Sequence, residues 1–133
     1  MTTPAPAGPG QATLSEVVFP ELLNHHGTYF GGAALSLMTR AAFVAASRAT
    51  RADVVVASVE GVEFRRPVRL GDLVEATAVV ERVDGRACEV SVAVVAETLT
   101  TGARRDVLTG TFRMVTVDQP ARRRVPAAAG VAG

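Results

Sequence analysis

One long proline-free stretch, from Phe30 to about Arg51, constrains the fold more than any other part of the chain. It is rich in alanine, leucine and methionine, which predicts a single long helix. Its apolar residues occupy most directions around the helix axis. One polar strip remains, formed by Ser36, Thr39, Arg40 and Ser47. Because a helix that is apolar on nearly every side must be buried on nearly every side, the rest of the chain has to enclose it.

The segments on either side of this helix are β-prone. Runs rich in β-branched residues cover residues 14–19, 53–64, 73–83, 86–99 and 107–117. Between two of these runs, Asp84-Gly85 predicts a hairpin with a type I′ turn. In the run that follows, Cys88, Val90, Val92 and Val94 alternate with Glu89, Ser91 and Ala93, which predicts one buried face. The order of elements predicts an α+β fold in which a curved antiparallel sheet of about five strands wraps one long central helix. The exposed edges of such a sheet favour an oligomer.

Composition indicates one domain with a hydrophobic core. The chain has 133 residues, of which 48% are hydrophobic and 20% charged. Its ends are rich in proline, glycine and alanine, so we expect flexible tails at residues 1–12 and 119–133 around a domain at residues 13–118. The run Arg122, Arg123 and Arg124 lies in the second tail, and we assign it no role.

Charge, cysteine content and hydropathy exclude several classes of function. The formal net charge is +1, and the 14 basic residues are all arginine, so nothing indicates nucleic-acid binding. The single cysteine, Cys88, cannot form an intrachain disulfide or a cysteine-rich zinc site. No apolar run is long enough for a membrane helix, and the first residues lack the pattern of a secretory signal. We therefore expect a cytoplasmic protein without membrane partners.

The segment from Asn24 to Gly32, Asn-His-His-Gly-Thr-Tyr-Phe-Gly-Gly, leads directly into the predicted helix. Two adjacent glycines at a helix start cost roughly 1 kcal/mol each relative to alanine, so they indicate close approach of a backbone or a ligand. The first amides of a helix lack intrahelical partners and can bind an oxyanion. Asn24 can hold a water or a carbonyl, and His25 or His26 can act as a base near neutral pH. The alternative is that the glycines only permit tight packing and that the histidines are solvated.

This segment resembles the one that precedes the central helix in hotdog-fold acyl-CoA thioesterases of the short bacterial and brain acyl-CoA hydrolase type. A second block, Val59 to Asp72, is similar to the strand and turn of that family, with the form F-x-x-P-V-x-x-G-D. The resemblance implies a hotdog fold that hydrolyses acyl-CoA to free acid and CoA. It also implies a homodimer, in many members a trimer of dimers, with acyl-CoA sites at the dimer interface. No metal and no redox cofactor are implied, and coenzyme A enters only as part of the substrate.

By the same resemblance, Asn24 is the asparagine of the site. The backbone amide at Gly32, together with Gly31, is expected to polarise the thioester carbonyl. The side chains expected to contact the substrate are His26, Phe30, Arg40, Glu60, Arg65 and Arg66. Arg65 and Arg66, like Arg69, flank the turn at Pro67 and can contact CoA phosphates, the alternative being a solvated basic turn. For Arg40, a contact to a CoA phosphate and an ion pair between subunits are both open.

The sequence departs from the family at one position of the site. Where the helix of the family carries an aspartate or glutamate as base or nucleophile, this sequence has Thr39, and the predicted helix contains no carboxylate. A hydroxyl is a poor proton acceptor, so three alternatives are open. His25 or His26 serves as the base, Glu60 or Glu63 reaches the site from the neighbouring strand, or the chain binds acyl thioesters without cleaving them. The last would make it an acyl-CoA or acyl-carrier sensor. A hotdog hydratase is less supported, because no aspartate adjoins the histidine pair.

Overall fold

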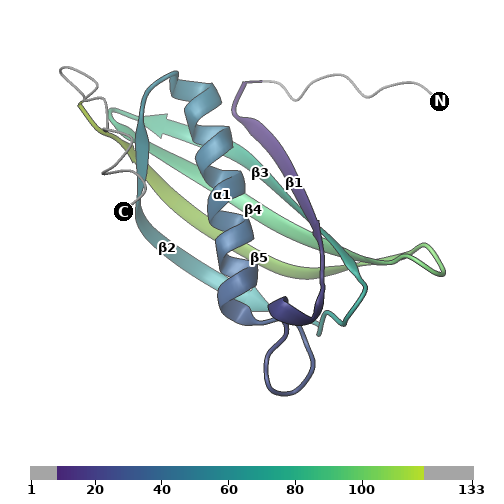
Figure 1. The fold of residues 1–133 in the computed structure, drawn as a ribbon. Helices are drawn as coiled ribbons and strands as arrows, with labels where there is room; N and C mark the ends of the chain where they lie inside the picture. Colours follow the sequence, from purple (N-terminus) through teal and green to yellow (C-terminus); the bar gives the residue numbers. More distant parts are fainter. Residues whose placement is uncertain (1–8, 119–133) are drawn as a thin grey trace, which may run out of the picture.

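In a computed structural model that describes residues 9–118, one helix lies across one face of a curved sheet (Figure 1). The elements in chain order are β1 (Gln11–Val17), a short 3-10 helix η1 (Pro20–Leu22), α1 (Gly31–Thr50), β2 (Val54–Phe64), β3 (Leu73–Asp84), β4 (Ala87–Thr98) and β5 (Ala103–Thr116). The five strands pair in the order β1-β3-β4-β5-β2, and every pairing is antiparallel. The predicted architecture, five strands around one long helix, is therefore confirmed.

Two strands begin earlier than their apolar runs predicted. β1 begins at Gln11 and β5 at Ala103, and both starts are polar or small in sequence. Each is held by backbone pairing, Gln11 opposite Val79 and Arg104 opposite Glu97, so the ladder rather than side-chain burial extends the strand. The sheet thus reaches into the segment expected to be the first tail. Residues 1–8 and 119–133, including the run Arg122–Arg124, lie outside the described part of the chain.

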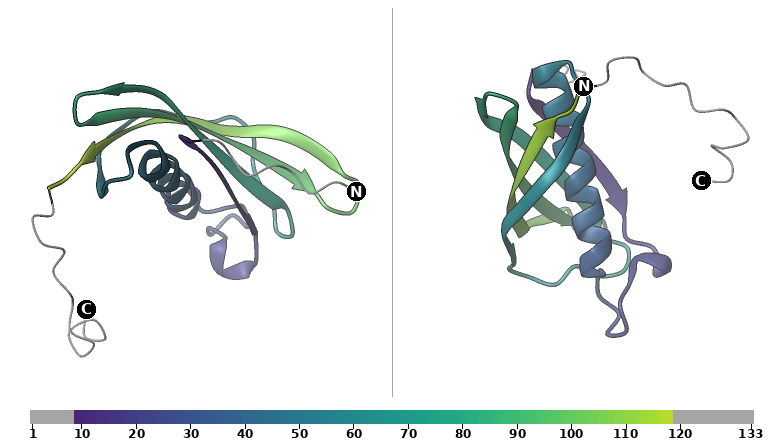
Figure 2. Two further views of the ribbon diagram at one scale, coloured as in Figure 1. Left: turned by 90° about the horizontal axis from the view of Figure 1, so that it is seen from above. Right: turned by 90° about the vertical axis from the view of Figure 1, so that its left-hand side faces the viewer.

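The inner face of α1 and the inner face of the sheet form the core. The buried helix residues are Ala34, Leu37, Met38, Ala41, Ala42, Ala45 and Ala46. Their small size lets the helix lie close against β3, β1 and β4 inside the curve of the sheet (Figure 2). The predicted alternation on β4 is confirmed, since the inward residues Cys88, Val90, Val92 and Val94 are all buried.

The side of α1 that faces away from the sheet is open to solvent in the single chain. Gly32, Ser36, Arg40 and Phe43 are all exposed along it, the Phe43 side chain at 47%. The prediction that the helix is enclosed on nearly every side is therefore wrong for one copy, because five strands curve around only one side of it.

The hairpin between β3 and β4 forms at the predicted place but with a different turn. Asp84 pairs with Ala87, so the two loop residues are Gly85 and Arg86. Gly85 has φ 62°, while Arg51 is the only non-glycine residue with positive φ between residues 9 and 118. Positive φ at the first loop position alone is the pattern of a type II′ turn. The type I′ prediction is wrong because the glycine stands first in the loop rather than second.

Backbone hydrogen bonds bring the two sequence blocks together. Tyr29 N donates to Val68 O at 2.8 Å, and Thr28 forms an isolated bridge with Arg69. Phe30 N donates to Leu22 O at 2.7 Å, which anchors the same segment to η1. The loop before α1 is thus fixed against the turn after β2, although the two are far apart in sequence.

Candidate active site

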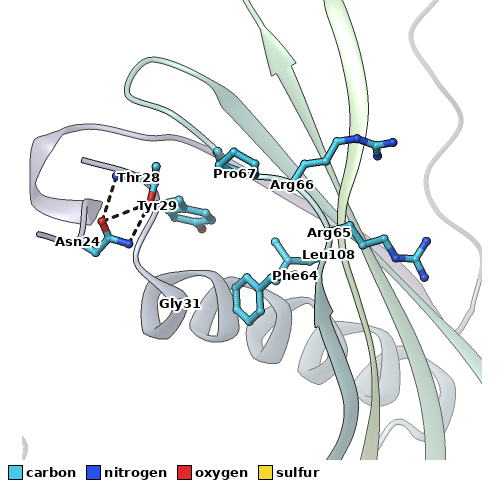
Figure 3. A pocket seen from close by; sticks show the side chains of 10 residues that line it. Asn24, Thr28, Tyr29, Gly31, Phe64, Arg65, Arg66, Pro67 and Leu108 are labelled. Atoms are coloured by element: carbon cyan, nitrogen blue, oxygen red, sulfur yellow. Dashed lines mark hydrogen bonds between the residues drawn. The ribbon is translucent and has the colours of Figure 1, made fainter. Parts of the chain in front are cut away.

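A cleft of about 360 Å³ lies where these two blocks meet (Figure 3). Its wall is formed by Asn24, Thr28, Tyr29, Gly31, Phe64, Arg65, Arg66, Pro67, Val68 and Leu108. The loop and the first residue of α1 supply one side, and the end of β2 with its following turn supplies the other. The structure therefore brings together four of the predicted site residues, namely Asn24, Gly31, Arg65 and Arg66.

The start of α1 offers backbone donors beside this cleft. Phe30 is the N-cap residue and makes no side-chain cap, and the first backbone bond of the helix runs from Ala34 N to Phe30 O at 3.0 Å. Among the described residues, no acceptor meets the N–H groups of Gly31, Gly32 or Ala33. These groups carry the positive end of the helix dipole, so they can stabilise a developing negative charge on a carbonyl oxygen.

An aromatic ring lies beside each of the two glycines. A Cβ on Gly31 would lie 3.4 Å from Cζ of Phe64, and a Cβ on Gly32 would lie 2.5 Å from Cε2 of Phe30. A Cβ at position 31 would therefore make an ordinary contact with Phe64, whereas the glycine at position 32 is needed to admit the Phe30 ring. The Phe30 side chain is 54% exposed and lies outside the cleft wall.

Asn24 closes its own loop with its side chain. Its Oδ1 accepts hydrogen bonds from His26 N at 2.8 Å and Thr28 N at 3.1 Å, and its Nδ2 donates to Thr28 Oγ1 at 3.0 Å. The backbone adds a bond from Asn24 N to Thr28 O at 2.7 Å. The amide oxygen is therefore engaged in the loop, and a second N–H on Nδ2 is the donor left for a ligand in the cleft.

The histidines and Thr39 lie outside the cleft wall. His25 and His26 are exposed at the tip of the loop, with ring centroids 4.1 Å apart. Thr39 is half-buried on α1 and donates its hydroxyl hydrogen to Leu35 O at 2.7 Å. Neither histidine is therefore positioned to take a proton inside the cleft of its own chain.

The other polar side chains proposed from the sequence also lie elsewhere. Glu60 and Glu63 are exposed on β2, and Glu60 borders a separate small hollow near Arg113. Arg40 forms an ion pair with Glu16 of β1 at 3.7 Å. Within residues 9–118, no carboxylate lines the cleft. The alternative in which Glu60 or Glu63 reaches the site is therefore not supported within one chain.

A hydrogen-bonded chain behind the cleft was missed by the sequence reasoning. Tyr29, only 7% exposed, donates its hydroxyl hydrogen to Glu16, which also pairs with Arg40. Burial, reinforced by this hydrogen bond and the Glu16 charge, raises the pKa of Tyr29 well above its ordinary value, and Arg40 opposes this only in part. Tyr29 therefore remains protonated and ties the cleft wall to β1 and α1. No local pattern links residues so far apart in sequence.

Arg65 and Arg66 stand at the mouth of the cleft. Their guanidinium groups point away from Asn24 and Tyr29 (Figure 3). Arg66 Nη1 donates to Asp106 O at 2.8 Å, and Arg65 forms one long contact of 3.5 Å to a threonine hydroxyl. Both are exposed, and neither forms an ion pair with a described residue. They can therefore meet an anionic group that approaches from solvent.

A buried ion pair holds the turn that carries these arginines. Asp72, 5% exposed, accepts a hydrogen bond from Arg105 Nη2 at 2.6 Å and another from Arg69 N at 2.9 Å. In the sequence, Asp72 ends the second block, and no spacing there predicts its partner Arg105. The pair accounts for the acid at the end of that block, since the buried Asp72 carboxylate is balanced by the partly exposed Arg105 and fixes the turn.

Comparison with known proteins decides the family. A family model described as the thioesterase superfamily matches residues 26–103, which include the end of the loop, α1, β2, β3 and β4. The chain belongs to the thioesterase superfamily. The predicted hotdog fold is confirmed by this match and by the structural likeness below. In the described part of this superfamily domain, no helix is long and apolar enough to cross a membrane, and no three potential metal-ligating acids, histidines or cysteines come together.

Similar proteins support the same family assignment. The chain is 35% identical over 82% of its length to YkhA of Bacillus subtilis, called an uncharacterized acyl-CoA thioester hydrolase. A crystal structure of an acyl-CoA hydrolase from Agrobacterium tumefaciens superposes with a TM-score of 0.81 and 45% identity over 90% of the chain and 47% of that protein. An apo-hexameric acyl-CoA thioesterase superposes with a TM-score of 0.81 and 30% identity over 84% of the chain and 72% of that protein. The chain spans 66% of the length of YkhA and 60% of the Helicobacter pylori protein VdlD, which is 30% identical to it.

Proposed function

We propose that this chain hydrolyses acyl-CoA to a free acid and CoA, at a site that a second copy of the chain completes. The observation that carries the proposal is the set of unpartnered amides at the start of α1, beside a cleft walled by Gly31 and Asn24. Attack of water on a thioester places negative charge on the carbonyl oxygen, and aligned backbone donors stabilise that charge. Relatives called acyl-CoA hydrolases support the same substrate class.

The cleft fits the parts of such a substrate in order. The thioester carbonyl would accept hydrogen bonds from the amides of Gly31 and Gly32, with the second N–H of Asn24 Nδ2 holding the water or the same oxygen. Phe64 and Leu108 supply apolar wall for the acyl group. Arg65 at the cleft mouth would attract the anionic CoA portion. Water then adds to the carbonyl carbon, the C–S bond breaks, and the proton released by the water ends on the CoA thiolate.

The surface that a second copy would cover is the β2 edge. β2 is an outer strand of the sheet and exposes Val55, Val56 and Val59. A long apolar edge strand is a pairing site for another strand, and Phe43 of α1 is a further exposed apolar side chain. We therefore propose a homodimer through β2, assembled further as a trimer of dimers, in keeping with the hexameric relative.

Thr39 belongs to the same proposed interface. It follows Gly31 and Leu35 at spacings of four along α1, and Gly31 lies beside Phe64 of β2. Its hydroxyl hydrogen is donated to Leu35 O, which leaves oxygen lone pairs to orient a water against a thioester held by the partner copy. It cannot take up the proton as a carboxylate would, so we expect slow turnover.

A non-catalytic acyl-CoA binding protein is the second candidate. The observation that favours it is the absence of a carboxylate from both the cleft wall and α1 in the part of the chain that the structure describes. Without a general base, the rate of hydrolysis falls by about 10²–10⁴-fold. Binding through the helix amides and arginines does not require that base.

The test is thiol release from a panel of short-chain and medium-chain acyl-CoA substrates. We expect slow release by the parent protein, and a rise of about 10–100-fold for Thr39→Asp, because a carboxylate restores the missing base. Thr39→Asn is the matched control, since it has similar size without a base, and should stay near the parent rate. Binding of acyl-CoA by the parent without any thiol release would favour the non-catalytic alternative. A folded Thr39→Asp variant with the parent rate would show that Thr39 is not at the base position.

A further inference from the structure

Behind the cleft, side chains from three elements meet at one carboxylate. Glu16 comes from β1, Tyr29 from the loop before α1 and Arg40 from α1 itself. β1 runs beside α1, at the opposite edge of the sheet from β2 (Figure 1). We propose that Tyr29 and Glu16 are positioning residues, whose hydrogen bond holds the segment before α1 so that the first amides of the helix face the thioester. The inference rests on the function proposed above, because those amides are its oxyanion donors.

The start of α1 depends on contacts made by the residues before it. Phe30, the N-cap residue, forms no side-chain cap with any residue that the structure describes, and the two glycines that follow it favour a helix poorly. The backbone supplies two ties, from Tyr29 N to Val68 O at 2.8 Å and from Phe30 N to Leu22 O at 2.7 Å. Both acceptors lie in connecting segments, one in the turn after β2 and the other in η1. The side chain of Tyr29 extends this anchor to a strand of the sheet.

The hydrogen bond between Tyr29 and Glu16 joins a buried donor to a charged acceptor. Tyr29 is buried, and its hydroxyl donates to Oε2 of Glu16. Hydrogen bonds to an ionised carboxylate are roughly twice as strong as those between neutral groups. Because burial and this bond raise the pKa of Tyr29 well above its ordinary value, the hydroxyl keeps the proton that it donates. Glu16 pairs with Val74 in the ladder between β1 and β3, so the acceptor is fixed in the sheet.

The same carboxylate also holds α1 through its other oxygen. Arg40 Nη2 lies 3.7 Å from Oε1 of Glu16. Glu16 therefore connects both the segment before the helix and the helix itself to β1. The Arg40 side chain is 58% exposed, and exposed ion pairs contribute little, so the Tyr29 hydroxyl is the stronger of the two ties.

The amides of Gly31 and Gly32 must be placed closely to act on a carbonyl oxygen. Catalytic groups work when they are held within about 0.5 Å of the productive geometry. Gly31 follows Tyr29 closely in the chain, so a shift of the Tyr29 backbone passes directly to the donors. The negative charge on the carbonyl oxygen develops in the transition state, so misplaced donors lower kcat more than they raise KM. Loss of the bond between Tyr29 and Glu16 should therefore reduce turnover while acyl-CoA still binds.

The experiment removes the bond from either end and then restores it. Tyr29→Phe lacks the donor and Glu16→Leu lacks the acceptor, and each should lower kcat for acyl-CoA by about five- to tenfold, with KM within about twofold of the parent. The double variant should lose no more than either single one, because both remove the same bond. Glu16→Gln keeps an oxygen that accepts the Tyr29 hydrogen, so it should retain kcat within about twofold. Thr13→Val is the matched control and should leave kcat unchanged, because it removes a side-chain hydrogen bond of β1, to Thr77, that involves no residue of the cleft.

Hydrogen–deuterium exchange gives a reading that does not depend on activity. The amides of Tyr29 and Phe30 are hydrogen-bonded to neighbouring segments, so their exchange reports how often this anchor opens. Peptides that contain both amides should exchange about five- to tenfold faster in Tyr29→Phe and Glu16→Leu than in the parent, and at the parent rate in Glu16→Gln.

The outcomes separate this inference from the proposed function. If the parent cleaves acyl-CoA and both Tyr29→Phe and Glu16→Leu keep its kcat, the positioning role is refuted and the function stands. If Glu16→Gln loses as much kcat as Glu16→Leu, the charge of the carboxylate matters rather than the bond, and the positioning role is again refuted. If the parent cleaves no thioester, the function is refuted. Faster exchange in the two variants that lack the bond would then still support the anchor, and unchanged exchange would overturn it.

Discussion

Replacing Asn24 in two ways separates its role in the loop from its role in the site. Asn24→Ala removes the oxygen that accepts two backbone N–H groups, as well as the donor to Thr28. Asn24→Asp keeps oxygen acceptors for both backbone groups and lets the Thr28 hydroxyl donate instead, so the loop can stay closed. Only the Nδ2 donor is lost in the second variant.

The expected magnitudes follow from those bonds. A net hydrogen bond contributes about 1 kcal/mol, and the His26 amide is exposed and can bond to water instead. Asn24→Ala should therefore lower the free energy of unfolding by about 1–2 kcal/mol, which corresponds to a Tm about 4–10 °C lower. Asn24→Asp should stay within about 2 °C of the parent. In thiol-release assays both variants should lose at least about tenfold in kcat/KM, because each lacks the donor that faces the thioester.

The comparison has two clear ways to fail. An Asn24→Asp variant with the parent rate would remove the Nδ2 donor from the mechanism and leave Asn24 as a loop residue only. An Asn24→Ala variant with the parent Tm and the parent rate would show that the observed loop bonds do not maintain the site. Differential scanning calorimetry and the rate assay on the same preparations give both readings.

The other predictions concern stability and assembly. Arg105→Ala leaves the buried carboxylate of Asp72 without its charge partner and should cost about 3 kcal/mol in urea unfolding, whereas Arg82→Ala, which breaks an exposed pair, should cost less than about 1 kcal/mol. Because the pKa of Tyr29 is raised in the folded chain, the folded state keeps a proton that the unfolded state loses above about pH 10, so stability should fall as pH rises through that range. Unfolding at about pH 8 and about pH 11 should show a smaller fall for Tyr29→Phe, and an equal fall would exclude Tyr29 as the cause. Val59→Glu should lower the mass seen in sedimentation, because it places a charge on the β2 edge, and an unchanged mass would move the interface elsewhere.

The fold was predictable because its signals are local. The alanine-rich stretch after Gly31 indicates a helix, and the alternation from Cys88 to Val94 indicates a strand with one buried face. Strand ends were missed where pairing, not burial, extends them, as at Gln11. The turn type at Gly85 was missed because it depends on which residue is last in the preceding strand, and that register is set across the whole sheet.

The site was predictable only where a residue acts through its own backbone or its near neighbours. In the sequence, Gly31 and Gly32 predict the start of the helix and Asn24 predicts the loop before it. The structure places all three at these positions. The pairs Asp72–Arg105 and Tyr29–Glu16 join distant elements, so no spacing in the sequence reports them. Residue type alone made the two histidines candidate bases. Their position at an exposed loop tip instead follows from the turn that the Asn24 side chain closes.

The proposed division of the chemistry between copies follows from what one chain has and lacks. One chain holds the donors for a thioester oxygen at Gly31 and a cleft for its acyl group, but no described base lines that cleft. Thr39, the position that the sequence resemblance aligns with the family's carboxylate, lies outside the cleft wall, and Val59 is exposed on the outer strand β2. A donor set in one copy and a water-orienting hydroxyl from the other would meet only after dimerisation. Dilution below the dimer dissociation constant should therefore reduce activity and assembly together, because neither half-site has both functions.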